Sequence, residues 1–135
     1  MERIYTKTHN KRIYLDDSDN YIDLNFNDST LPARFYSMVE RIQNRTTSEE
    51  KKAGSLSEED VKGTLETLAN VQKPIGEEID AFFGEGTCMK IWGCNNPAFD
   101  LCMNFFEQLS PLFEKYAKDF SDSLNKYSPG RTGNV

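Results

Sequence analysis

The stretch Ile79–Phe120, IDAFFGEGTCMKIWGCNNPAFDLCMNFFEQLSPLFEKYAKDF, decides the fold of this chain. It predicts the end of one helix, then a glycine-bounded turn, and then a long final helix. Inside the turn, Cys88–Trp92 predicts one short helical segment. We expect Asn95 or Asn96 to cap the final helix, with Pro97 at its first position. The stretch therefore predicts surfaces for packing and contains no reaction chemistry.

The final helix carries two apolar stripes about 100° apart around its axis, whereas a surface helix needs only one. Either the helix is sandwiched inside its own domain, or one stripe packs on the fold and the other contacts another chain. We favour the second interpretation, because few apolar residues lie elsewhere. One stripe is Ala98, Cys102, Phe105, Leu109, Leu112 and Tyr116. The other is Phe99, Met103, Phe106, Ser110, Phe113, Ala117, Phe120 and Leu124.

Two further helices are expected upstream. Apolar residues at helical spacing predict a first helix from about Leu31 to Asn44. The polar and charged residues 45–56 predict an exposed, mobile loop. A second helix is expected to begin at Ser57 and to run to Phe83, with Pro74 inside it. Because of this proline the helix should either kink near Val71 or split into two pieces, the second from Lys73 to Phe83, and we favour the kink.

The N-terminal part shows strand signals. Arg12–Leu15 and Tyr21–Phe26 alternate apolar and polar residues and flank an Asp-rich turn, and Arg3–Thr6 could add a third strand. The chain is thus expected to be α+β and predominantly α, with a β-hairpin or short meander followed by three to four helices. We expect one domain over residues 1–127, β-rich to residue 27 and helical from 28, and a disordered tail over residues 128–135.

Composition excludes several classes of function. The chain has 135 residues, 37% of them hydrophobic, and a net charge of -6. An acidic chain is unsuited to neutralising phosphates, so we expect no nucleic-acid partner. No apolar run approaches the roughly 20 residues that span a bilayer, and the first residues lack the apolar core of a secretory signal. The expectation is a cytosolic protein without a membrane partner.

Catalytic and metal sites are not predicted. The chain has three cysteines, Cys88, Cys94 and Cys102, and its single histidine is His9. The cysteine spacings match no zinc pattern, and the Asp-rich turn lacks the glycine and glutamate of a calcium loop. No catalytic motif occurs. We therefore expect packing cysteines, no cofactor, no metal and no enzymatic activity.

A family resemblance adds a functional expectation. Ile79–Gly93 is similar to a recurring I-x-x-F-F-G-E-G-T-x-x-K-I-F-G signature, with Trp92 where phenylalanine is commoner. Leu101–Phe113 continues the resemblance more loosely, and the residues before Tyr21 do not match. The signature resembles that of small proteins encoded among the tail genes of phages and prophages of Gram-positive bacteria. These proteins are tail assembly chaperones.

The resemblance implies an acidic helical carrier in the bacterial host cytoplasm. Such a carrier coats the apolar tape measure protein, recruits tail tube proteins and self-associates weakly at most. We expect exposed apolar side chains of the final helix to make the contact. Two alternatives stay open: a structural tail or connector subunit of the particle, and a small acidic regulatory binding protein of a mobile element. The expected contact residues are Phe99, Met103, Phe106, Phe113 and Phe120.

Overall fold

One β-hairpin and four helices make up the part of the chain that the computed structural model describes. The backbone is described for residues 1–54 and 60–127, and the side chains for residues 1–46 and 60–127. The expected fold class, α+β and mainly α, is confirmed by an antiparallel two-strand hairpin followed by four helices in the described residues. The expected tail over residues 128–135 lies outside the described residues. The elements are β1 (Asn10–Tyr14), β2 (Tyr21–Asn25), α1 (Leu31–Gly54), α2 (Val61–Phe83), α3 (Thr87–Trp92) and α4 (Phe99–Lys126).

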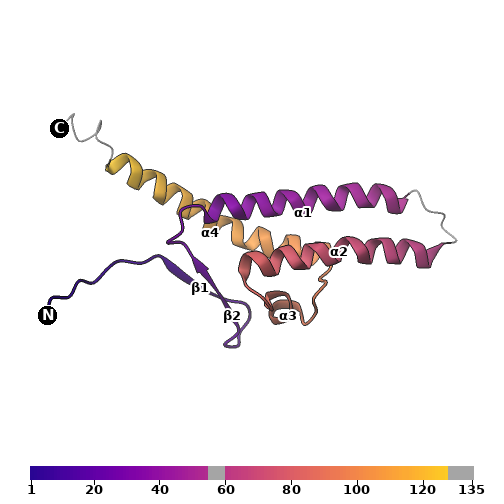
Figure 1. The fold of residues 1–135 in the computed structure, drawn as a ribbon, viewed down its shortest axis with the longest axis horizontal. Helices are drawn as coiled ribbons and strands as arrows, with labels where there is room; N and C mark the ends of the chain where they lie inside the picture. The colour runs from indigo at the N-terminus through magenta and orange to yellow at the C-terminus, as the bar shows by residue number, and fades with distance from the viewer. Residues whose placement is uncertain (55–59, 128–135) are drawn as a thin grey trace.

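The helices α1 and α2 form a long antiparallel hairpin, and α4 packs at the end where α1 begins and α2 finishes (Figure 1). The C-terminal half of α4 projects beyond this hairpin, on the side where the N-terminal arm also leaves the body (Figure 1). The β-hairpin and α3 lie together on the other side of α2. The molecule is therefore elongated, with different elements exposed at its two ends.

Aromatic rings join the three long helices. Phe35 of α1 stacks on Phe113 of α4, with 4.1 Å between ring centroids and 8° between ring planes. Phe82 of α2 contacts both of these rings. Phe26, which follows β2, packs against Phe113 from the hairpin side. The core is therefore centred on the middle of α4, where rings from every layer meet and remove large apolar areas from water.

The two strands pair antiparallel, with Arg12 opposite Asp23 and Ile13 opposite Ile22. Alternate residues of β2 point into the core, as the sequence predicted, because side chains on a strand alternate between its faces. The suggested additional strand at Arg3–Thr6 is wrong: residues 1–9 have no regular structure. The side chains of residues 1–9 are all exposed, so no burial of apolar surface holds this segment against the edge of the sheet. The inward residues are Ile22, Leu24 and Phe26.

The first helix is longer than its apolar pattern. It was expected to end near Asn44, with a loop over residues 45–56, but α1 continues to Gly54. Thr46 is buried, and its hydroxyl donates to the carbonyl of Ile42 within the helix. The following residues are rich in glutamate, lysine and alanine, which favour helix without any apolar face. Residues 55–59 lie outside the described part of the chain.

The second helix begins at Val61. Its expected start at Ser57 lies outside the described residues. Asp60 is its N-cap, and the carboxylate accepts from the backbone N–H of Gly63 at 3.0 Å. The helix runs through Pro74 without splitting into two pieces. The kink near Val71 stays a prediction. At its end, the N–H of Gly84 donates to the carbonyl of Asp80.

The turn between α2 and α4 is held by side chains and by glycines with positive φ. The carboxylate of Asp80 accepts from the backbone N–H of Cys88 at 2.9 Å, which caps the short helix α3. Gly86 and Gly93 adopt the left-handed conformation on either side of α3. The expected short helix closed by a glycine is confirmed. The final helix begins at Phe99 with Ala98 as its N-cap, not with Asn95 or Asn96 as expected.

The helix α3 fixes the β-hairpin to the helical body. Asn20 donates to the carbonyl of Lys90 at 2.9 Å, and the Lys90 ammonium donates to the carbonyl of Tyr21 at 3.1 Å. A two-stranded sheet is marginal alone in water, so these contacts and the buried strand residues hold it in place.

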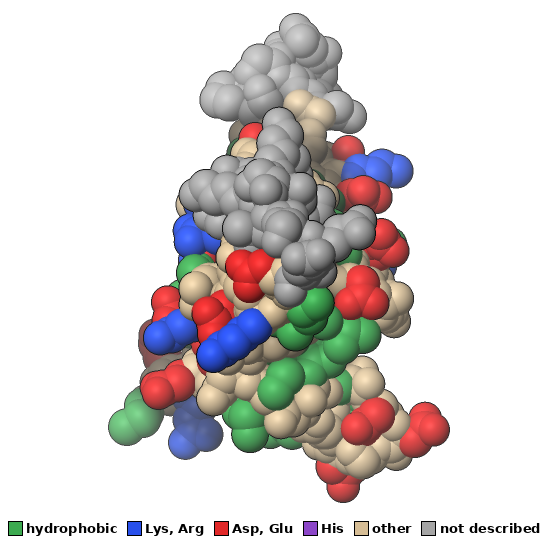
Figure 2. Space-filling view, turned by 90° about the vertical axis from the view of Figure 1, so that its right-hand side faces the viewer, with side chains coloured by type: hydrophobic (Ala, Val, Ile, Leu, Met, Phe, Trp, Pro, Cys, Tyr) green, Lys and Arg blue, Asp and Glu red, His purple; other side chains and the backbone are tan. Residues whose placement is uncertain are grey.

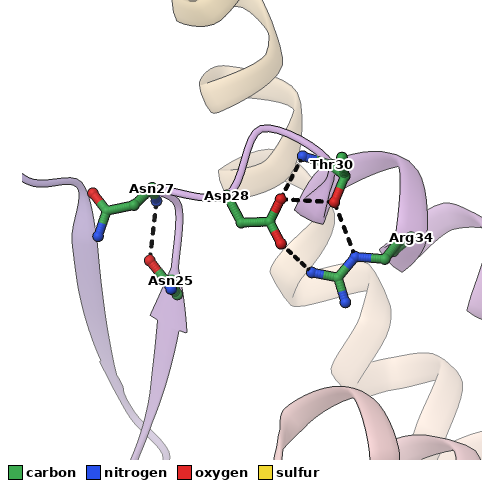
Figure 3. Close-up of polar contacts among 5 residues, drawn as sticks. All are labelled: Asn25, Asn27, Asp28, Thr30 and Arg34. Atoms are coloured by element: carbon green, nitrogen blue, oxygen red, sulfur yellow. Dashed lines mark hydrogen bonds and ion pairs between the residues drawn. The ribbon is translucent and has the colours of Figure 1, made fainter.

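Asp28 organises the start of α1 (Figure 3). Its carboxylate accepts from the Thr30 backbone N–H at 2.9 Å, from the Thr30 hydroxyl at 2.7 Å, and from the Arg34 guanidinium at 2.6 Å. These bonds favour the charged carboxylate. The Thr30 hydroxyl, followed by the Thr30 N–H, accordingly lowers the pKa of Asp28 below its usual 3.8.

The lowered pKa predicts an acid-sensitive contribution to stability. Because the folded state binds the Asp28 proton less tightly than the unfolded state, the contribution is present above about pH 3.8 and is lost as the pH falls below it. Asp28→Asn should therefore lower the Tm at neutral pH, and the Tm difference from wild type should shrink toward about pH 2. Thermal melts across this range measure it. A difference that stays constant or widens on acidification contradicts the assignment.

Candidate functional site

The middle of the predicted contact row is part of the core, which corrects two of the five expected contact residues. Phe106 is 1% exposed and Phe113 is 0% exposed. Both rings pack against Phe35 of α1, so α1 covers the face of α4 that was expected to meet another chain. A partner cannot reach these two side chains while the monomer is folded.

The remaining three predicted residues lie near the two ends of α4. Phe99 and Met103, in its first turns, are half-buried and pack at the edge of the core. Phe120, in the projecting half, is exposed. With a rise of about 1.5 Å per residue, Phe99 and Phe120 are roughly 30 Å apart along the helix. The predicted row is therefore two separate accessible surfaces and not one continuous groove.

A second surface, missed by the sequence analysis, lies on α2. One face of this helix meets α1, where Glu78 pairs with Arg41 at 2.7 Å and Phe82 contacts Phe35. A second face of α2 lies about 80–90° around the helix axis from the face that meets α1. It consists of Val61, Leu65, Leu68, Gln72, Gly76, Ile79 and Phe83. The C-terminal half of this second face is covered and its N-terminal half is open.

The connection to α4 explains why only half of this face is covered. Asn95 and Pro97 lie directly against Gly76, where an added Cβ would be 2.1 Å from the Asn95 carbonyl oxygen. Further along, Phe83 packs against Phe105 at 5.4 Å between centroids. Because α4 starts beside the middle of α2, no described helix underlies the first two turns of α2 on this face.

Three apolar side chains of α2 therefore remain uncovered by α4. We call them the open row: Val61, Leu65 and Leu68. These side chains are 60%, 59% and 37% exposed. Figure 2 views the molecule from this end and shows hydrophobic side chains gathered beside the atoms that are not described. Charged residues flank the row, among them Lys62 and Glu66. An exposed apolar row at helical spacing, with a charged border, is typical of a site that receives another helix.

The helical spacing of the open row was visible in the sequence, but its exposure was not. The sequence predicted only that these residues repeat at helical intervals, since spacing alone cannot show how far the neighbouring helix extends. The place where α4 begins depends on the contact between Gly76 and the Asn95–Pro97 segment, which joins residues far apart in sequence. A glycine in the interior of a helix was the one available signal, because such a glycine usually has a packing reason.

Two of the three cysteines pack in the interior, and the third is exposed. Cys88 and Cys102 are buried, and burial raises the pKa of each thiol to about 12. Cys94 is exposed in the connection between α3 and α4. A thiol that stays protonated is a poor nucleophile and a poor metal ligand. Within residues 1–46 and 60–127, no group of three or more His, Cys, Asp or Glu side chains could hold a metal ion.

The described residues offer shallow hollows instead of a deep ligand pocket. The hollow between the N-terminal arm and α4 is lined by His9, Phe26 and Tyr116 and has a volume near 170 Å³. His9 meets Tyr116 edge-on, at 6.1 Å between ring centroids. A hollow lined by Arg34, Arg41, Glu78 and Phe82 is larger, near 420 Å³, and is more open to solvent. Pockets for small ligands usually enclose about 300–1,000 Å³, so this hollow reaches the size range without being enclosed. No described helix combines the length and apolarity needed to cross a bilayer.

The fold and the open row together define a small, mainly helical domain whose exposed apolar surfaces suit contacts with other proteins. The chain belongs to a family of unknown function, DUF6673, which matches residues 18–134. The match begins just before β2 and leaves out the N-terminal arm and β1. No curated protein and no solved structure matches the chain.

Proposed function

We propose that this protein is a phage or prophage tail assembly chaperone that binds an apolar helix of the tape measure protein. The observation that carries the proposal is the open row on α2, a helix-spaced apolar surface that its own fold leaves uncovered. The resemblance of Ile79–Gly93 to the tail assembly chaperone signature points to the same function. The proposal places the protein in the bacterial host cytoplasm, where it also recruits tail tube proteins.

The contact is assigned to α2 and the beginning of α4. A client helix lying along Val61, Leu65 and Leu68 would fill the layer that α4 occupies further along the hairpin. Phe99 and Met103 are half-buried in the first turns of α4, the part of α4 that begins beside the middle of α2. Each leucine that becomes buried contributes about 1.5–3 kcal/mol, which is enough to keep an aggregation-prone helix in solution when several act together.

The overall charge supports a carrier role. A net charge of -6 favours solubility of the complex, because like-charged particles repel one another. An apolar row with a charged border allows the same molecule to be soluble alone and to bind an apolar helix. These properties would also suit other helical clients, so the client must be identified by experiment.

The experiment is co-expression with the tape measure protein, with wild type compared with the double variant Leu65→Asp, Leu68→Asp. Wild type should hold the tape measure in the soluble fraction. Burying two aspartates in place of leucines should weaken binding roughly a hundredfold or more and send the client into the pellet. Both positions are exposed, so the variant should retain its helical circular dichroism and its Tm.

A matched control changes the net charge equally on another face of α2. Lys73→Gln together with Asn70→Asp also lowers the charge by two, at exposed positions outside the open row and its border. This control should solubilise the tape measure as wild type does. If the control and the leucine variant behave alike, or if folded wild type never retains the client, the proposed function is wrong.

A further inference from the structure

The strand β1 has a free edge. In the described residues the sheet has two strands, so one side of β1 has no pairing partner. The N–H of Leu15 donates to the carbonyl of Asn20, and the N–H of Phe26 donates to the carbonyl of His9. Because antiparallel pairs alternate, the odd-numbered residues of β1 bond to β2 and the even-numbered residues direct their N–H and C=O away from it. The free edge therefore consists of the backbone groups of three exposed residues, Asn10, Arg12 and Tyr14.

A groove runs along this free edge, between β1 and α4. Its wider part is a hollow near 290 Å³ that is lined by Ile13–Leu15, α3 and α4, and by no residue of β2. The hollow near 170 Å³ at His9 and Lys11 continues the groove toward the start of β1, and Leu112 lines both hollows. The strand rises roughly 20 Å between these two ends, so the groove is long enough for about six extended residues.

The α4 side of the groove has an apolar floor and a polar rim. Leu101 is 45% exposed there, and Leu112 is only partly buried. On the rim, the side-chain amide of Gln108 donates to the side-chain carbonyl of Asn104 at 2.9 Å. A strand added to the free edge would lie about 4.8 Å from β1, where the side chains of its inner face would contact this floor.

We propose that the groove binds an extended peptide segment of another protein, which adds to β1 as a third strand antiparallel to it. The unpaired N–H and C=O groups of Arg12 and Tyr14 hydrogen-bond to the peptide backbone, and alternate side chains of the peptide fill the hollow. Antiparallel pairing is the more stable arrangement per residue. It places the C-terminal end of the peptide beside Lys11, at the start of β1.

The charges at that end of the groove select the peptide. Lys11 lies on the same face of β1 as Ile13, because strand side chains alternate, and it lines the narrower hollow together with Lys115. Asp119 also lines this hollow and balances only one of the two ammonium groups. An inward-pointing lysine at a sheet edge rejects a wholly apolar strand. The peptide therefore has apolar residues at alternate positions and a carboxylate near its C-terminal end.

The first test is selection from a display library of random peptides, about twice the length of the groove. The target is the full chain carrying Leu65→Asp and Leu68→Asp, so that the open row cannot capture a helical peptide. Enriched peptides should alternate apolar and polar residues and carry aspartate or glutamate toward the C-terminal end. No enrichment, or enrichment of peptides with apolar residues at helical spacing, overturns the proposal.

A matched pair of variants at Arg12 tests the backbone contact. Arg12→Pro and Arg12→Ala both lose the guanidinium contacts with Asp23 and Tyr21, but only proline removes the outward N–H. Proline is tolerated at a sheet edge where the missing N–H faces outward, so both variants should keep the circular dichroism of the parent. A selected peptide should bind Arg12→Pro about tenfold more weakly than Arg12→Ala. Equal affinities overturn the proposal.

Amide hydrogen exchange resolved by residue tests strand pairing without any substitution in β1. The bound peptide should slow the exchange of the Arg12 and Tyr14 amides, and leave that of Ile13, which already bonds to β2, nearly unchanged. Unchanged exchange at Arg12 and Tyr14 on binding overturns the proposal. None of these readouts uses the tape measure or the open row, so failure here is distinct from failure of the proposed function.

Discussion

Phe113→Ser should unfold or severely destabilise the protein, whereas Phe120→Ser should not. Phe113 is fully buried, stacks on Phe35 at 4.1 Å, and also contacts Phe26 and Phe82. Removing a buried phenylalanine costs about 3–5 kcal/mol, and a buried hydroxyl without a partner adds to that cost. Typical domains are stable by only about 5–15 kcal/mol, so most of the stability should be lost.

The comparison with Phe120 separates packing from binding. The two phenylalanines lie on the same stripe of the same helix, seven residues apart, and differ chiefly in exposure. Urea or thermal unfolding followed by circular dichroism measures both variants. If Phe113→Ser keeps a wild-type midpoint, the ring is not in the core. The earlier expectation that this row forms an open contact surface would then stand.

Gly76→Ala should also be strongly destabilising, although glycine to alanine inside a helix normally stabilises by about 1 kcal/mol. A Cβ at this position would be 2.1 Å from the backbone oxygen of Asn95 and 3.6 Å from Pro97 Cδ. A backbone atom cannot rotate away as a side chain can, so the Asn95–Pro97 segment must move. Overpacking costs about 1–3 kcal/mol and occasionally more. A contact of 2.1 Å with a backbone oxygen belongs at the upper end of that range, so a net loss of about 2 kcal/mol or more remains after the gain in helix propensity.

Asn70→Ala provides the matched control for Gly76→Ala. Asn70 is exposed on the same helix, so the substitution should give a small gain from helix propensity alone. Thermal melts of the two variants should therefore move in opposite directions. An increase in Tm for Gly76→Ala would show that α4 does not begin against this glycine. The explanation for the open row would then fail as well.

Much of the fold follows from local patterns. The alternation in Tyr21–Phe26 predicted β2 and its inward residues, and the glycines around Cys88–Trp92 predicted the short helix between two turns. These features depend on residues close in sequence. The length of α1 did not follow, because residues 45–54 have helix propensity without an apolar pattern, and polarity was taken as the sign of a loop.

The candidate site was harder to predict than the fold. The two apolar stripes on α4 indicated more than one neighbour for this helix. From the start of α4 to Phe113, however, most residues of both stripes pack inside the monomer. Phe106 was indistinguishable from Phe120 in sequence, since both belong to one row at the same spacing. Their difference arises from where α1 begins and α4 leaves it, which is a property of tertiary packing. The exposure of Leu65 has the same kind of origin.

Hydrogen exchange of the protein alone and with a tape measure segment tests the central claim most directly. The claim is that the client covers the open row and the first turns of α4, while the middle of α4 already belongs to the core. Binding should slow exchange in residues 61–72 and 99–103, and the already protected segment 106–113 should not change. Protection that appears in 106–113, or binding that leaves 61–72 unaffected, would contradict the account.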